Sequence, residues 1–142
     1  MSFGESTNPE IERIGKIIVD SIYKVHYTLG PGLLESVYSI CLTHELRSRG
    51  LKVERELKLP VIYDGVRIES ALRLDLLVES CIVVETKAAE KLIPVFEAQL
   101  MTYLKLTGYT LGFLVNFNVP FIKDGLKRVV RTPRDRSSNS KQ

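Results

Sequence analysis

The sequence predicts an α/β domain in which a mixed sheet carries helices on both faces. Two observations predict this class. Two stretches with helical spacing of apolar residues precede a series of strand-like segments, and a further helix separates two apolar segments near the C-terminal end. Strands joined by tight turns pair antiparallel, whereas a crossover helix joins strands that pair in parallel. The predicted order is two helices, four strands, one crossover helix and two strands.

Two helices are predicted at the N-terminal end. Thr7 and Asn8 offer N-cap oxygens and Pro9 suits the first turn; apolar residues then recur at helical spacing until Gly30. The second helix follows at once and ends at Gly50. Its expected apolar stripe consists of Leu33, Leu34, Val37, Ile40, Cys41 and Leu46.

Alternating residues and turn signals predict the strands that follow. Pro60 is expected to interrupt the first strand, because proline cannot donate to a strand ladder. Asp64-Gly65 is a strong hairpin signal, and Glu79-Ser80 is expected to form a second tight turn. The four expected strands are residues 52–63, which Pro60 divides into 52–59 and 61–63, and residues 66–68, 71–78 and 81–87.

A helix and two strands complete the predicted domain. Pro94 opens the helix and Gly108 ends it. A buried strand at 109–117 and a short strand at 126–130 follow.

Composition and charge limit the class of protein. The chain has 142 residues, 44% hydrophobic and 26% charged, which is typical of one soluble globular domain. We predict that residues 9–131 form it, with disorder at 1–8 and in a basic tail at 132–142. No membrane span, signal peptide or disulfide framework is expected, so the sequence indicates a reduced, cytoplasmic protein.

The positive charge is concentrated at the C-terminal end. Residues 123–142 contain seven basic and two acidic residues, a net charge of +5. Because the whole chain has a net charge of +3, the other residues have a net charge of −2. This distribution is compatible with a polyanionic partner such as nucleic acid.

Two neighbouring strands carry the residues most indicative of chemistry. Asp75 lies in one strand, and Glu85 and Lys87 lie in its hairpin partner, on one face because a single residue separates them. Asp75 and Glu85 would supply carboxylate oxygens suited to Mg²⁺ or Mn²⁺, with the carbonyl of Thr86 and waters completing the coordination. Lys87 would help to orient a water for attack on a phosphodiester. The alternative is a surface ion pair between Glu85 and Lys87.

Four further residues extend this candidate site. Arg73 lies two residues before Asp75 and would contact a phosphate or pair with an acid. Gln99 and Tyr103 share one face of the third helix, which could return over the end of the strand; the alternative is an ordinary amphipathic face. Glu35 lies in the first turn of the second helix, where a carboxylate also favours the helix dipole.

Several of these segments together resemble one known family. Residues 32–38, GLLESVY, are similar to the signature of the GxxExxY proteins, a family within the PD-(D/E)XK nuclease superfamily. The similarity extends from about residue 11 to about residue 130 and includes Asp75 and the Glu-Thr-Lys triplet at 85–87. The segment QLMTY at 99–103 looks like the QxxxY element of exonuclease-like branches.

The resemblance implies a restriction-endonuclease-like core, a four- to five-stranded mixed sheet flanked by helices, with a magnesium site at one end. It implies that Asp75 and Glu85 are metal ligands and that Lys87 is the catalytic lysine. It also implies that Glu35 is an auxiliary acid that ligates the metal directly or through water. Gln99 and Tyr103 would support the site or contact the substrate.

The leading hypothesis is therefore a divalent-metal-dependent nuclease that acts on DNA. A non-catalytic nucleic-acid-binding module is one alternative, based on the basic segment 123–136 and the aromatic residues Tyr109, Phe117 and Phe121. A protein-interaction domain with a solvated acidic face is another. A homodimer is compatible with a small nuclease that cuts two strands.

Overall fold

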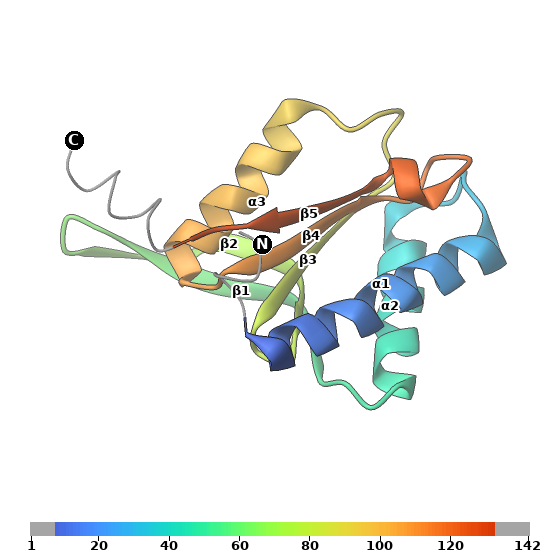
Figure 1. Ribbon diagram of the computed structural model, residues 1–142. Coiled ribbons are helices and arrows are strands. Elements are labelled where there is room, and N and C mark those ends of the chain that lie inside the picture. The colour runs from blue at the N-terminus through green and yellow to red at the C-terminus, as the bar shows by residue number, and fades with distance from the viewer. Residues whose placement is uncertain (1–7, 133–142) are drawn as a thin grey trace.

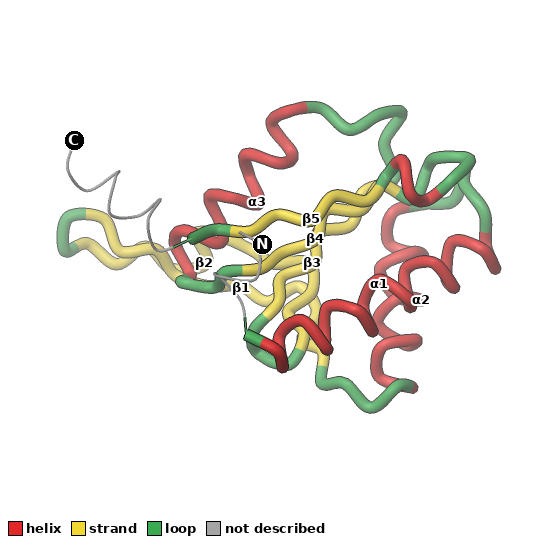
Figure 2. The backbone as a smooth tube through the Cα atoms, viewed as in Figure 1, coloured by secondary structure: helices red, strands yellow, loops and turns green. Residues whose placement is uncertain are grey.

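The computed structural model describes residues 8–132 of the chain (Figures 1 and 2). The disorder predicted for residues 1–8 and 132–142 lies outside the described residues, except at residues 8 and 132. The helices and strands of the described part are α1 (Pro9–Leu29), α2 (Glu35–Ser48), β1 (Val53–Tyr63), β2 (Val66–Val78), β3 (Ile82–Lys87), α3 (Pro94–Thr107), β4 (Leu111–Asn116), the 3₁₀ turn η2 (Ile122–Asp124) and β5 (Leu126–Val130). No helix among these is long and apolar enough to cross a membrane.

The strands of the described part form one sheet in the order β1-β2-β3-β4-β5. β3 and β4 pair in parallel, and α3 makes the crossover between them; the other neighbours pair antiparallel. The predicted mixed α/β fold is thus confirmed.

Helices cover both faces of this sheet, with α1 and α2 on one side and α3 on the other (Figure 1). On the first face, Ile18, Ile22 and Leu42 pack with the strand residues Leu76 and Val84. The second core contains, from α3 and the strands, Leu100, Leu104, Leu77, Val83 and Leu114. Apolar residues therefore cover both faces of the central strand β3, as its continuous Ile-Val-Val run predicts.

Most predicted helix ends and turns are confirmed. The Asn8 side chain caps α1 by accepting a hydrogen bond from the backbone N–H of Ile11 at 2.8 Å. Gly108 ends α3 in the left-handed conformation (φ 89°). Asp64 and Gly65 both have positive φ, which suits the tight turn that joins β1 to β2.

The sheet has five strands, whereas six were predicted, because two expected strands merge; the expected interruption at Pro60 does not occur either. β1 continues through Pro60, where the pairing register shifts between Leu59 and Val61. β1 is an edge strand, so a residue without an N–H is tolerated there. The segments expected at 66–68 and 71–78 form one strand, and Ser70 adopts φ 52° within it. The crossover helix therefore links the third strand to the fourth.

The predicted apolar stripe of α2 is confirmed only in part. The helix begins only at Glu35, so Leu33 and Leu34 precede it and are exposed, as is Ile40 within it. Leu46 is buried and Cys41 packs against the core, as predicted. The buried face is centred on Leu46 together with Tyr38 and Leu42, which recur every four residues. Because Leu33 and Leu34 lie before the helix, they do not define the face of α2 that meets the sheet.

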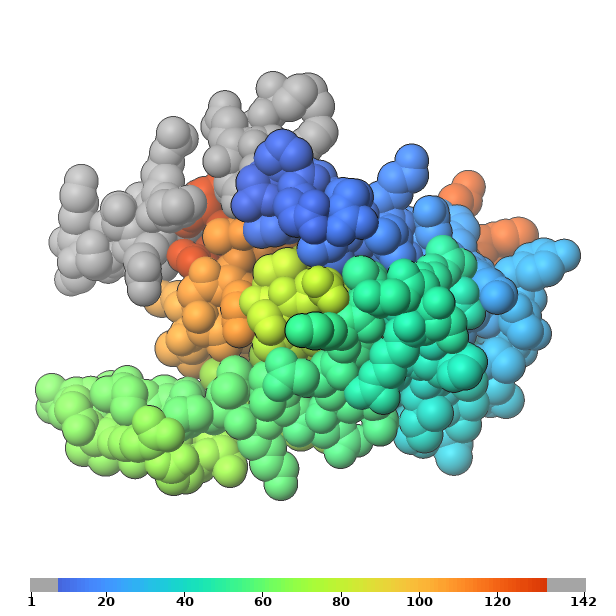
Figure 3. Space-filling model, turned by 90° about the horizontal axis from the view of Figure 1, so that it is seen from below, coloured from blue at the N-terminus to red at the C-terminus, as the bar shows by residue number. Residues whose placement is uncertain are grey.

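The hairpin of β1 and β2 projects from the body of the molecule (Figures 1 and 3). The registered pairing of β2 with β3 covers only residues 76–78 of β2, so the outer part of the hairpin is a two-stranded ribbon. Its exposed apolar side chains near the tip are Ile62, Tyr63, Val66 and Ile68.

Candidate active site

Two carboxylates bridge β2 and β3 at the point where their regular pairing stops. The last registered pair is Leu76 with Val84. At the next position, the backbone N–H of Asp75 donates to Glu85 Oε2 at 2.9 Å, and the backbone N–H of Thr86 donates to Asp75 Oδ2 at 2.9 Å. Each carboxylate thus accepts a hydrogen bond from the backbone of the opposite strand, a position that a carbonyl occupies in a regular ladder. This exchange places the two acids side by side within the sheet.

Burial makes this pair electrostatically unusual. Glu85 is 3% exposed and Asp75 8% exposed. Burial raises the pKa of Glu85 to about 8, and the neighbouring charge of Asp75 adds to the rise. The Asp75 N–H, Lys87 and Arg73 act in the opposite direction and do not compensate. The second oxygen of Glu85 makes no hydrogen bond within residues 8–132.

Two basic side chains lie beside the acids. Arg73 Nη2 lies 3.4 Å from Asp75 Oδ1, and Arg73 Nη1 lies 3.9 Å from Glu56. Lys87, the last residue of β3, is half-buried, and its Nζ lies 4.8 Å from the centroid of the Phe96 ring of α3. The backbone carbonyl of Lys87 accepts a hydrogen bond from Phe117 at 2.9 Å, which fixes this end of the strand. An ammonium group is therefore held on the α3 side of the sheet.

α3 contributes Tyr103 to the same region. Burial raises the pKa of the half-buried Tyr103 hydroxyl, and the charges of Glu85 and Asp75 raise it further, so this side chain lies within electrostatic reach of both acids. Gln99 is exposed one turn earlier on α3 and makes no hydrogen bond within the described part of the chain. Leu100 and Leu104, each of which directly follows one of these polar residues, pack α3 on the sheet.

Glu35 occupies a different position. It is the exposed first residue of α2, the helix that packs on the opposite face of the sheet. Among residues 8–132, no three His, Cys, Asp or Glu side chains form a group that could hold a metal ion. The structure therefore brings Asp75 and Glu85 together and does not add Glu35 to them.

The structure assigns Tyr38 and Asn116 supporting positions that the sequence did not. The buried Tyr38 hydroxyl donates to the Gly30 carbonyl at 2.6 Å and accepts from the Leu33 N–H at 3.0 Å, which fixes the turn before Glu35. The buried Asn116 accepts from the Ala89 N–H at 2.9 Å and donates to its carbonyl at 3.0 Å. An amide at the end of an otherwise apolar strand was the available signal for this second role.

The pair of acids fits a hard divalent cation. Mg²⁺ and Mn²⁺ prefer carboxylate oxygens. Arg73 and Lys87 balance the two buried carboxylates only in part, because the pKa of Glu85 is still raised, and one Glu85 oxygen makes no hydrogen bond to the described residues. Thr86 lies between Glu85 and Lys87 on the same strand end. Asp75, Glu85 and Thr86 are thus the residues available to hold an ion.

Comparison with known proteins agrees with this geometry. Residues 12–129 match the model of the family described as the PD-(D/E)XK nuclease superfamily, and this match includes Asp75, Glu85 and Lys87. No curated protein and no solved structure matches the chain. Most proteins with this fold and this pattern are nuclease hydrolases that use divalent metals. Because the match covers most of the chain, this protein belongs to the PD-(D/E)XK nuclease superfamily.

Proposed function

We propose that this protein is a divalent-metal-dependent nuclease that hydrolyses phosphodiester bonds in DNA. The observation that carries the proposal is the buried contact between Asp75 and Glu85, with Lys87 two residues further along the same face of β3. A nuclease of this superfamily needs acids that hold a cation and a basic group beside them, and these three residues meet that need.

Each residue has a distinct role in this proposal. Asp75, Glu85 and the carbonyl of Thr86 would hold Mg²⁺ or Mn²⁺. When bound, the ion would stabilise charge on the phosphate and activate water for in-line attack. Lys87 would hold that water beside the scissile phosphate, because its ammonium is a donor with a fixed position against Phe96.

The remaining predicted residues surround this centre. Arg73 is about half exposed and would exchange its weak contact with Asp75 for a contact with a phosphate of the substrate. Gln99 and Tyr103 would contact the substrate or the acids from α3. Glu35 would act as an auxiliary acid after a movement of the turn that precedes α2, since it is exposed and the GLLESVY segment resembles the GxxExxY signature.

The proposal is tested by cleavage of single-stranded, duplex, nicked and branched DNA with Mg²⁺ or Mn²⁺. Wild-type protein should cleave at least one of these substrates, and chelation by EDTA should stop it. Glu85→Gln and Lys87→Ala should each reduce the rate by about a hundredfold or more. Lys16→Ala, which alters an exposed lysine on α1, is the matched control and should leave the rate unchanged. Activity that survives both Glu85→Gln and Lys87→Ala would refute the site.

The structure weakens the argument for a purely binding module. Phe117 is fully buried and stacks on Tyr38 with the ring centroids 4.6 Å apart, and Tyr109 is half-buried. Of the three aromatic residues that suggested base stacking, Phe121 alone is largely exposed. A cytoplasmic location and a homodimer remain part of the proposal and are tested by fractionation and by light scattering.

A further inference from the structure

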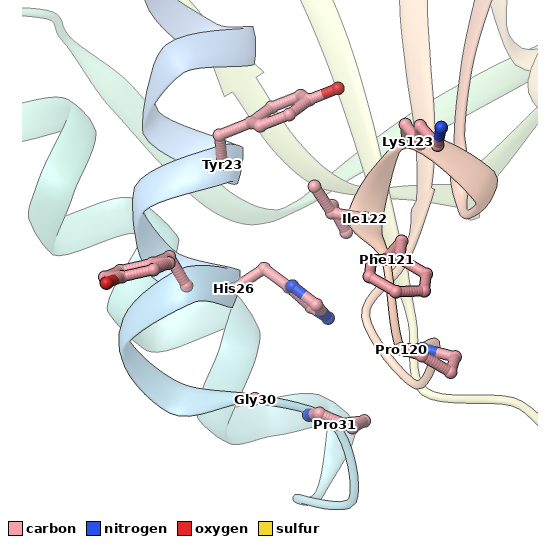
Figure 4. A pocket seen from close by; sticks show the side chains of 9 residues that line it. Tyr23, His26, Gly30, Pro31, Pro120, Phe121, Ile122 and Lys123 are labelled. Carbon is pink, nitrogen blue, oxygen red and sulfur yellow. The ribbon is translucent and has the colours of Figure 1, made fainter.

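A separate cavity of about 480 Å³ lies between the C-terminal half of α1 and the segment that follows β4. Figure 4 shows Tyr23 and His26 on the α1 side and Pro120, Phe121 and Lys123 on the other side. None of the candidate active-site residues lines this cavity. Its role is therefore not explained by the acids on β2 and β3.

Hydrogen bonds and packing hold both walls of the cavity in place. His26 Nε2 donates to the carbonyl of Val119 at 2.7 Å, which ties α1 to the segment after β4. Ile122 is buried in the core beneath that segment. The Tyr38 hydroxyl holds the carbonyl of Gly30, which lines the end of the cavity. The cavity is thus formed before any ligand enters, as is usual for binding sites.

The lining combines aromatic rings with positive charge. Phe121 is 68% exposed and Tyr27 91% exposed, and Tyr23 is also exposed. Lys123 is the one formally charged residue of the lining, and no acidic residue contributes to it. Rings offered to solvent beside an ammonium group suit a nucleobase that stacks on a ring while its phosphate meets the cation.

The cavity is linked to the end of β3, where Lys87 lies, by two stacked side chains. The Phe117 N–H donates to the carbonyl of Lys87, and the Phe117 ring stacks on Tyr38. The Tyr38 hydroxyl in turn donates a hydrogen bond to the carbonyl of Gly30, which lines the cavity. Lys87 also pairs with Asn116, the last residue of β4, so the cavity segment that follows β4 begins at the same end of the sheet as Lys87.

We propose that this cavity binds an unpaired base of a single-stranded segment of nucleic acid, between Tyr23 and Phe121, with a phosphate at Lys123. The ligand class rests on the nuclease function proposed above. A base in a duplex is stacked on both faces, so only an unpaired base can enter between these side chains. The protein should therefore prefer single-stranded regions to continuous duplex.

The absence of tryptophan from the sequence provides a direct test. Phe121→Trp places one reporter at the cavity, and Tyr63→Trp places a matched control at the exposed tip of the hairpin. Each variant is titrated in EDTA with a short single-stranded DNA, the corresponding RNA and the DNA duplex. Single strands should quench the emission of Phe121→Trp at concentrations at least tenfold lower than the duplex, and should leave Tyr63→Trp unchanged. A difference between DNA and RNA would identify the preferred sugar.

Removal of the rings provides the second measurement. Phe121→Ala and Tyr23→Ala should each weaken the binding of single strands by between about fivefold and about a hundredfold. Tyr63→Ala should not weaken it, and unchanged thermal unfolding would show that the exposed substitutions leave the fold intact. Equal quenching by duplex, or unchanged binding by both cavity variants, would overturn the proposal.

The two proposals fail in different ways. If wild-type protein cleaves DNA but Phe121→Ala binds single strands normally, the cavity proposal is wrong and the nuclease proposal stands. If single strands quench Phe121→Trp but wild-type protein cleaves nothing with Mg²⁺ or Mn²⁺, the reverse holds. Lys87→Ala should lose cleavage and keep the quenching response when introduced with Phe121→Trp.

Discussion

Glu85→Gln should make the metal-free protein more stable at alkaline pH. In the folded protein the pKa of Glu85 is about 8, compared with an ordinary value of 4.5, because the carboxyl is buried beside Asp75. The folded state therefore keeps a proton that the unfolded chain loses between these values. The resulting penalty is absent below pH 4.5, grows as the pH rises and is complete above pH 8. Glutamine keeps the oxygen that accepts from the Asp75 N–H and carries no charge.

The size of the effect follows from the two pKa values. One pKa unit corresponds to about 1.4 kcal/mol, so the full penalty has an upper limit of about 5 kcal/mol above pH 8. Glutamine also loses the attraction of the Glu85 charge to Lys87 and Arg73, and its hydrogen bonding differs slightly. The net gain in the free energy of unfolding should therefore be about 2 to 4 kcal/mol.

Urea unfolding of both proteins in EDTA at pH 4.5, 6.5 and 9 measures the difference in the free energy of unfolding. The gain should be near zero at pH 4.5 and largest at pH 9. Glu54→Gln, an exposed glutamate on β1, should show no such trend. A gain of equal size at every pH, or a loss at pH 9, would refute the argument from burial.

Three further predictions concern the ion and the framework of the site. Mg²⁺ at ten times its dissociation constant should stabilise the wild type by about 1.4 kcal/mol at pH 8, raising its melting temperature by a few degrees, and Asp75→Asn should abolish the shift. Tyr38→Phe removes both hydrogen bonds of the buried hydroxyl and should cost about 1 to 3 kcal/mol in urea unfolding, and unchanged stability would contradict this. Gly125→Ala places a Cβ 2.2 Å from the Asn116 carbonyl oxygen and should cost about 1 to 3 kcal/mol, whereas Gly15→Ala, with ordinary contacts of 3.5 Å, should be tolerated.

Local signals predicted the turns and helix ends well. Asn8, Asp64-Gly65 and Gly108 act through their own backbone and side-chain chemistry, which neighbours in the sequence largely determine. The interruption expected at Pro60 did not occur, because its effect depends on whether the strand has one partner or two. Sheet order is a long-range property that the local pattern does not contain.

The sequence predicted that Asp75 and Glu85 lie on neighbouring strands, but it did not predict the hydrogen bonds that connect them. The turn at Glu79-Ser80 places Asp75 opposite Glu85, and this follows from counting along two antiparallel strands. The hydrogen bonds from each backbone to the opposite carboxylate do not follow from counting, because they require the regular ladder to end at Leu76. The position of Glu35 depends on the packing of α2, and the phase of that helix was the feature predicted incorrectly.

The bridge between Asp75 and Glu85 has a consequence for any relative in which either acid is replaced. These two side chains also hold β2 and β3 together, because each carboxylate accepts a hydrogen bond from a backbone N–H of the opposite strand. Alanine or leucine at either position would leave that amide without a partner. Inactive relatives should therefore carry asparagine in place of Asp75 and glutamine in place of Glu85. These amides keep an oxygen that accepts the hydrogen bond and carry no charge.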